Sequence, residues 1–305
     1  MKKMKLIRQG VILLSMFVIN FTSCTKVKNE ANSDTTSLQQ LAKDQADVQS
    51  ASEDGLNDAN NVVTPGTTKS RWVPNNATVD TTISGDTTIY TITYNGNNRW
   101  NTRSRTGTII VKRLTAIPWS QQGTTIWITF VNYKVNKGST NKAVTLNGSK
   151  AEKNVSGGVI GDGTQVIHEV SGALQLTFDD NTTRTWNISR RRTFTGTLSQ
   201  LVLTIDGFGS SAGYNNLETW GTNRKGELFY TQINQSVIRK ISTCGLDPTS
   251  GIVKHSIPSD NKSATITYGY DSNDQPVSST STDCPVKYKL DWVKNGHSGT
   301  VYNYN

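Results

Sequence analysis

The stretch TQVIHEVSGALQLTFD, residues 164–179, carries the pattern that decides the fold. In an extended chain its apolar side chains share one face: Val166, Val170, Leu174, Leu176 and Phe178. Polar side chains occupy the opposite face: Gln165, Glu169, Gln175 and Asp179. One apolar and one polar face per strand are typical of an antiparallel sheet with one side in water.

The same extended pattern continues on both sides of this stretch, with many Thr, Val, Ile, Tyr and Trp residues. Strands are predicted at 87–95, 104–114, 124–135, 141–148, 164–179, 182–195, 198–206, 217–222, 226–240, 251–257, 262–270, 285–294 and 299–304. Turn signals stand at Asn95-Gly96, Asn147-Gly148, Asp162-Gly163, 179–181 and Asn295-Gly296. We therefore expect residues 75–305 to form an all-β body, an antiparallel meander built as a sandwich or as a long curled sheet.

The predicted strand at 182–195 is unusual, because arginines share a face with large apolar residues. In an extended chain the side chains of Arg184, Arg190 and Arg192 lie on the same face as those of Trp186 and Phe194. The sequence alone gives no reason for this arrangement.

Residues 24–74 are expected to form a lipidated tether with a short helix and a linker. Ser37 and Gln40 resemble a capping box, which predicts a helix over about 37–50, with Ala59 as its furthest end. The apolar stripe of this helix is thin, so we expect it to lie loosely on the body. Residues 60–74 contain turn residues and are predicted to be a linker.

The first 23 residues have the order of a secretory signal peptide. A basic start precedes an apolar run over 10–19, which is too short to span a bilayer comfortably. Phe21-Thr22-Ser23-Cys24 looks like the lipobox of a bacterial lipoprotein, so Cys24 is the predicted lipidation site. The alternative is an ordinary cleaved signal in which Cys24 is incidental. We expect attachment to the outer membrane through the lipid, on its periplasmic face or at the cell surface.

The charge of the 305-residue chain is divided unevenly. The formal net charge is +9, but residues 24–70 hold four basic and seven acidic residues, and residues 71–305 hold 24 basic and 16 acidic ones. A basic body can favour anionic partners, but we interpret the excess as solvated surface. No compact Lys/Arg tract is present, and we expect no nucleic-acid partner.

Three cysteines are present, and Cys24 is assigned to lipid. Cys244 and Cys284 are the remaining pair, and disulfides persist outside the cytosol. A disulfide between them is predicted, with free buried thiols as the alternative.

Several segments together resemble a family of uncharacterised Bacteroidota lipoproteins: 103–111, 130–136, 183–190, 221–226, and the segments around Cys244, Gly251 and Cys284. The resemblance implies a β-rich, lipid-anchored envelope protein and brings no catalytic residues. Asp-Thr-x patterns similar to O-glycosylation sites of this phylum predict sugar on Thr35, Thr81 or Thr87.

The motifs for chemistry are weak. Gly209-Ser-Ser-Ala-Gly213 matches a nucleophile elbow with Ser211 as nucleophile, but a strand rather than a helix is predicted to follow. His168 is expected to be a satisfied core residue, and no cofactor or metal site is expected. Tryptophans offer surfaces for sugars at Trp100, Trp119, Trp127 and Trp220, whereas Trp186 and Trp292 are expected in the core.

The expected function is a non-enzymatic envelope protein, an interaction or glycan-contacting module whose partner is a glycan or an envelope protein. A structural or assembly role and a serine hydrolase using Ser211 are the alternatives.

Overall fold

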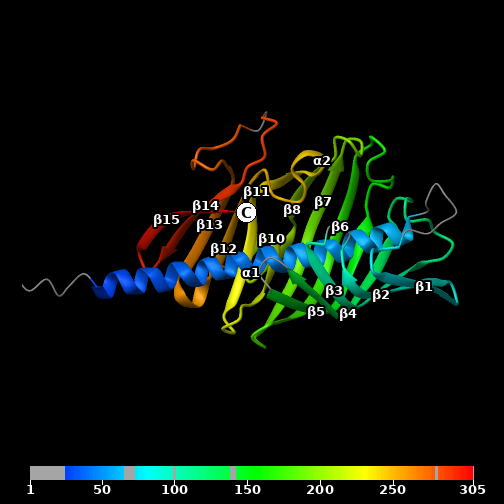
Figure 1. The fold of residues 1–305 in the computed structure, drawn as a ribbon, viewed down its shortest axis with the longest axis horizontal. Helices are drawn as coiled ribbons and strands as arrows, with labels where there is room; N and C mark the ends of the chain where they lie inside the picture. Colours follow the sequence, from blue (N-terminus) through cyan, green and yellow to red (C-terminus); the bar gives the residue numbers. More distant parts are fainter. Residues whose placement is uncertain (1–24, 65–72, 99–100, 138–141, 279–280, 305) are drawn as a thin grey trace, which may run out of the picture.

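The computed structural model describes residues 25–64, 73–98, 101–137, 142–278 and 281–304. The signal peptide and Cys24 lie outside the described residues. The described chain forms one long antiparallel sheet that curls around a single long helix (Figure 1). No helix in the described ranges is both long and apolar enough to cross a membrane.

Two α-helices and a 3-10 turn accompany the strands: α1 (Thr25–Val63), α2 (Ile241–Cys244) and η1 (Pro258–Asp260). The strands are β1 (Ala77–Ser84), β2 (Thr87–Asn97), β3 (Arg103–Leu114), β4 (Thr125–Lys137), β5 (Lys142–Asn154), β6 (Val166–Phe178), β7 (Thr183–Thr195), β8 (Val202–Gly207), β9 (Gly209–Ser211), β10 (Tyr214–Thr222), β11 (Leu228–Lys240), β12 (Ser250–Ile257), β13 (Lys262–Tyr270), β14 (Lys287–Lys294) and β15 (His297–Tyr304).

The strand order confirms the predicted antiparallel meander and selects the curled sheet over the sandwich. Strands β1 to β7 are neighbours in sequence order, and the path continues through β10 to β15. Strand β8 pairs with both β7 and β11, whereas β10 pairs with the same two strands elsewhere along their length. Every predicted strand overlaps an observed one, but β1 and β9 were not predicted.

Two of the predicted turns are instead inside strands. Asn295-Gly296 does form the β14–β15 turn, with positive φ at both residues. Asn147-Gly148, however, lies within β5. A Cβ at Gly148 would lie 2.5 Å from the carbonyl oxygen of Ala173 on β6, so this glycine permits close approach of two strands rather than a reversal. Asn95-Gly96 likewise lies within β2.

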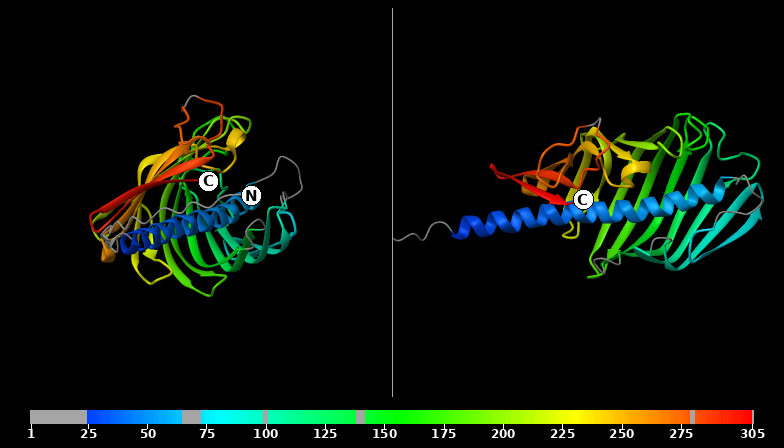
Figure 2. Two further views of the ribbon diagram at one scale, coloured as in Figure 1. Left: turned by 60° about the vertical axis from the view of Figure 1, so that its left-hand side comes forward. Right: turned by 45° about the horizontal axis from the view of Figure 1, so that its top comes forward.

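Helix α1 is longer than predicted and is not loosely attached. It runs across the concave side of the sheet, with strands curving around it (Figure 2). Val48, Leu56 and Ala59 are fully buried, and only Ala46 and Asn61 are exposed between residues 40 and 64. Residues 60–63 of the expected linker at 60–74 are therefore helical instead, and residues 65–72 lie outside the described residues. Tertiary burial, rather than a strong apolar stripe, stabilises this helix.

Gly55 lets α1 lie close to the sheet. A Cβ at this position would lie 2.8 Å from Ile109 Cδ1 on β3 and 2.8 Å from Phe130 Cε1 on β4. Leu56 and Ala59 belong to the same apolar core as these two residues. The helix is therefore part of the interior of the body.

Candidate ligand-binding cleft beside helix α1

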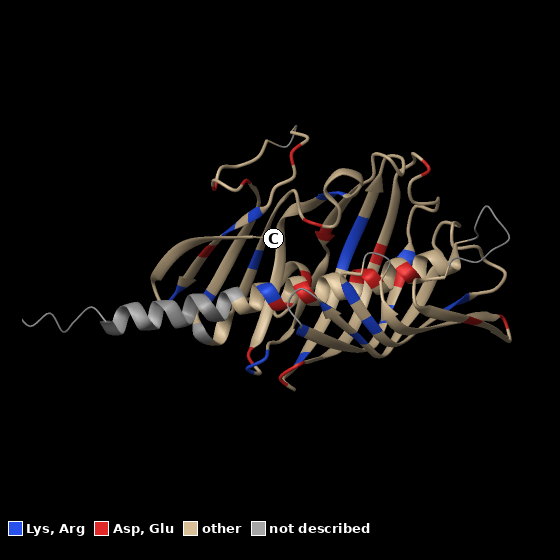
Figure 3. Ribbon diagram, viewed as in Figure 1, with Lys and Arg blue, Asp and Glu red and all other residues tan. Residues whose placement is uncertain are grey.

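Acidic positions of α1 lie among Lys and Arg positions of the strands around it (Figure 3), and their side chains form ion pairs. Arg190 Nη1 donates to Glu53 Oε1 at 2.7 Å, and Arg192 Nη2 lies 2.9 Å from Glu53 Oε2. All three side chains are at most 1% exposed. Burial alone would raise the pKa of Glu53, but Arg192 and Arg190 outweigh burial and lower it to about 2. Glu53 is therefore ionised at neutral pH and compensates two buried cations.

The same kind of pairing recurs along the helix. Four further acidic residues of α1 form ion pairs with strands or their loops: Asp44 with Arg224 at 2.6 Å, Asp47 with Lys137 at 3.6 Å, Asp54 with Arg103 at 2.5 Å, and Asp58 with Arg105 at 2.8 Å. The interpretation of the basic excess as solvated surface is thus wrong for these arginines and for the buried arginines of β7. Part of the charge on the body is compensated by the acidic helix.

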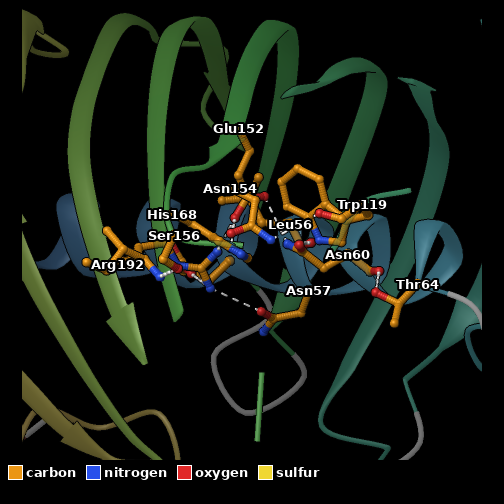
Figure 4. A network of polar contacts seen from close by, with 12 residues as sticks. Leu56, Asn57, Asn60, Thr64, Trp119, Glu152, Asn154, Ser156, His168 and Arg192 are labelled. Carbon is orange, nitrogen blue, oxygen red and sulfur yellow. Dashed lines mark hydrogen bonds and ion pairs between the residues drawn. The ribbon is translucent and has the colours of Figure 1, made fainter. Parts of the chain in front are cut away.

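Glu152 of β5 joins the helix to β6 and β7 (Figure 4). It accepts hydrogen bonds from Asn60 Nδ2 at 2.9 Å, His168 Nδ1 at 2.9 Å and Arg192 Nη1 at 3.0 Å. Burial would raise the pKa of Glu152, but the His168 hydrogen bond and Arg192 lower it overall. His168 is 1% exposed and is the satisfied core histidine that the sequence predicted.

Lys150 and Ser52 form a buried pair in which the lysine amine donates to the serine hydroxyl. Burial, together with the positive charge of Arg190, holds the pKa of Lys150 well below its usual range. A lysine with a lowered pKa beside a serine is one arrangement that activates a nucleophile. Ser52 is 0% exposed and Lys150 is 2% exposed, however, so a substrate cannot reach the hydroxyl in this arrangement. The pair is part of the packing between α1 and β5.

A cavity of about 940 Å³ opens beside the C-terminal half of α1, and we call it the rim cleft. Its polar wall is α1 from Asp54 to Asn61. Its apolar wall includes Phe194, Leu198, Leu201, Leu203, Ile241 and Leu246, from β7, the β7–β8 loop, β8, α2 and the residues that follow α2. This volume lies within the range of small-molecule sites, and a mixture of apolar and polar lining is typical of them.

Leu198 is the most exposed large apolar side chain of the described residues and lies on the apolar wall. Its exposure is 73%, and Val159, in the neighbouring β5–β6 loop, is 43% exposed. Exposed aliphatic surface next to a cavity marks a place where a ligand can remove apolar area from water.

The ionic side chains of the polar wall are compensated within the protein. Asp58 accepts from Arg105 Nη1 and from the Tyr94 hydroxyl, each at 2.8 Å. Burial is the largest influence on Asp58 and raises its pKa to about 6, in spite of Arg105. Asn57, Asn60 and Asn61 supply the uncharged polar groups of this wall.

Three buried polar atoms of the cleft lining have no hydrogen-bond partner among the described residues. They are Asn60 Oδ1, Arg105 Nε and Arg192 Nε. Their residues are 7%, 5% and 1% exposed. These atoms are buried, so a ligand in the cleft does not reach them, and the accessible amides of the polar wall are those of Asn57 and Asn61.

Ser211 is not placed as a nucleophile elbow requires. It ends β9, and Ala212 and Gly213, both with positive φ, turn the chain directly into β10. A strand therefore follows the serine, as predicted, and the strand-to-helix turn of an elbow is absent. His255 is buried on β12, where its Nδ1 lies 2.9 Å from the Thr231 hydroxyl.

The predicted cysteine pair is confirmed, because the Cys244 and Cys284 sulfur atoms lie 2.07 Å apart and their Cα atoms 5.4 Å apart. Cys244 ends α2, between Ile241 and Leu246 of the apolar wall. The disulfide therefore ties one side of the rim cleft to the segment that precedes β14.

The predicted glycosylation sites differ in accessibility. Thr81 is exposed on β1, at the edge of the sheet, whereas Thr87 is half-buried and its hydroxyl donates to Asp86. Thr35 lies in α1, but its side chain is outside the described residues. Glycosylation of these threonines stays a prediction.

The tryptophans proposed for sugar contact are not gathered in one place. Trp119 is 4% exposed in the core, Trp127 is 47% exposed on β4, and Trp220 is half-buried on β10. Trp100 lies outside the described residues. Trp186 and Trp292 are buried, as predicted.

Within the part of the chain that the structure describes, no group of three or more His, Cys, Asp or Glu side chains is arranged to hold a metal ion. Comparison of the chain with protein-family models, with curated proteins and with solved structures gave no match. The resemblance to Bacteroidota lipoproteins therefore stays a prediction.

Proposed function

We propose that the protein is a non-enzymatic cell-envelope protein, anchored in the outer membrane by lipid on Cys24, whose β body contacts a glycan-containing ligand or another envelope component. The basic and apolar leader that ends in Phe21-Thr22-Ser23-Cys24 supports the anchor. The predicted disulfide, found between Cys244 and Cys284, suits an oxidising compartment.

The rim cleft is the observation that carries the binding role. It combines a volume of about 940 Å³ with an aliphatic wall on which Leu198 is exposed and with a wall of amides, and the buried ion pairs around Glu53 hold the polar wall in place. A pre-formed cavity with a few fixed polar groups is the usual form of a binding site.

A structural or assembly role is the second candidate, and β15 supports it. This strand is at one end of the sheet path and pairs only with β14 among the described strands. Tyr304 near its end is 68% exposed. An open edge of this kind can pair with a strand of another chain.

Two measurements test the proposal. Radiolabelled palmitate should enter the wild-type protein and not the Cys24→Ala variant, and label that persists in the variant would reject the anchor. An array of glycan-containing ligands, lipid-linked sugars included, is probed with the full chain carrying Cys24→Ala. The chain should bind a restricted set of them, and less strongly when Asn61→Ala is added. An array on which no ligand is bound would favour the assembly role.

A further inference from the structure

The apolar wall of the rim cleft is aliphatic rather than aromatic. Among the apolar residues that line the cleft only Phe194 is aromatic, and Phe194 is 5% exposed. Leu198, by contrast, is 73% exposed. Sugars that bind by stacking need exposed aromatic faces, whereas flexible hydrocarbon chains are well accommodated by leucine and isoleucine. This wall therefore favours an aliphatic chain over a bare sugar.

The polar wall carries no uncompensated charge for a charged ligand. Among the lining residues, Asp54 and Asp58 are balanced by Arg105 and Arg192. Each of these four is also in an ion pair with a protein side chain, at distances between 2.5 and 3.0 Å. A charged head group placed here would lose hydration without gaining a free counter-charge.

The accessible polar groups of this wall are neutral. Asn57 is half-buried and Asn61 is exposed, and the amide of each carries both hydrogen-bond donors and an acceptor. A hydroxyl group donates and accepts at once, so a hydroxyl-rich head complements this mixture better than an anion or a cation does.

We infer that the rim cleft binds a neutral amphiphile, with its aliphatic chain on the Leu198–Leu203 and Ile241–Leu246 wall and its hydroxyl-bearing head at Asn57 and Asn61. This inference rests on the proposed function and deepens it, because the glycan contacted is then the head of a lipid-linked sugar. The aliphatic chain supplies most of the affinity, and the amides select the head.

Alkyl glycosides are suitable probes. The full chain carrying Cys24→Ala is titrated calorimetrically with dodecyl maltoside below its micelle concentration, and with decyl maltoside, maltose and dodecyl phosphocholine. One dodecyl maltoside should bind per chain. Removing two methylenes should weaken binding by about 15-fold, from about 0.8 kcal/mol for each buried methylene. Maltose should not bind measurably, and the phosphocholine should bind at least about tenfold more weakly.

Two exposed leucines provide a matched pair of variants. Leu198→Ser on the apolar wall should weaken dodecyl maltoside binding by at least about tenfold, as expected for loss of a buried leucine contact. Leu228→Ser changes a leucine that is 56% exposed at the start of β11, outside the cleft lining, and should bind as the wild type does. Asn61→Ala should reduce the preference for maltoside over phosphocholine.

The inference is overturned if dodecyl maltoside does not bind, if maltose binds as tightly, or if both leucine variants lose affinity equally. Its failure is distinct from failure of the anchor. Palmitate on Cys24 without amphiphile binding rejects only the cleft ligand, whereas amphiphile binding without palmitate rejects only the anchor.

Discussion

Arg192 of β7 and Glu53 of α1 form an ion pair of 2.9 Å in which each side chain is only 1% exposed. The same arginine also donates to Glu152 of β5 at 3.0 Å. A charge this deeply buried requires its partner, because isolated charges are very costly away from water. The helix and the sheet therefore depend on each other.

Removing the helix carboxylate should destabilise the whole body. Glu53→Ala leaves Arg190 and Arg192 without one of their counter-charges, and breaking a buried pair typically costs about 3–5 kcal/mol. Urea unfolding measures this loss. Glu169→Ala is the matched control, because Glu169 pairs at 2.7 Å with Arg191, which is 49% exposed. Its cost should be below about 1 kcal/mol, and equal losses in both variants would contradict the buried pairing.

Enlarging Gly55 tests the close approach of α1 to the sheet. Gly55→Leu would insert a side chain where even a Cβ meets Ile109 and Phe130 at 2.8 Å, and overpacking of this kind costs about 1–3 kcal/mol. Ala46→Leu places the same side chain on the exposed part of the helix, so its melting temperature should stay near that of the wild type. If the helix lay loosely on the body, Gly55→Leu would instead stabilise it through helix propensity.

The pH dependence of stability should carry a contribution from His255. Burial, followed by the charge of Arg184, lowers its pKa to about 3. The unfolded chain takes up this proton near pH 6.5, so the native state is favoured above that pH and loses stability as the pH falls toward 3. Between about pH 6.5 and pH 3, the free energy of unfolding should fall by up to about 1.4 kcal/mol for each pH unit.

His255→Gln should remove this part of the loss of stability at low pH. The midpoint of urea unfolding should then shift less between pH 7 and pH 4 than it does in the wild type. The control is His297→Gln, which changes an exposed residue on β15. Identical pH profiles for wild type and His255→Gln would show that the histidine is not buried in its neutral form.

The disulfide should stabilise the fold and shape the rim cleft. Its two cysteines are 40 residues apart in sequence, and closing a loop of this length is worth about 4 kcal/mol on the chain-entropy estimate. Cys244→Ser, Cys284→Ser and the double variant should lose similar stability in thermal unfolding. A reductant should lower the melting temperature of the wild type and leave the double variant unchanged. A larger loss in the double variant would mean that the thiols act separately.

The alternation of residues was sufficient to predict most of the sheet. Val166, Val170 and Leu174 are buried on β6 as their spacing predicted, because a strand with one covered face imposes a period of two. The arginines of β7 were a real signal that the sequence left unexplained. Arg184 and Arg190 share the apolar face because acceptors on α1, Gln45 and Glu53, reach them.

The burial of the helix and the rim cleft could not be predicted from local sequence patterns, because both depend on contacts between residues far apart in the sequence. A polar helix such as α1 has a thin apolar stripe, so its burial among arginines could not be inferred from its own sequence. Asn60 was assigned to a linker, although its amide bonds Glu152 of β5. The rim cleft joins Asn57 of the helix to Leu198 of a loop, and only the curl of the sheet brings them together.

Hydrogen exchange of the α1 backbone tests the central claim, that the helix is an interior element of the body, most directly. In the native protein at neutral pH, amides of residues 47–60 should exchange as slowly as those of β5, β6 and β7, because opening the helix breaks the ion pairs of Glu53. Exchange of these helix amides within seconds, while the strands remain protected, would contradict the account.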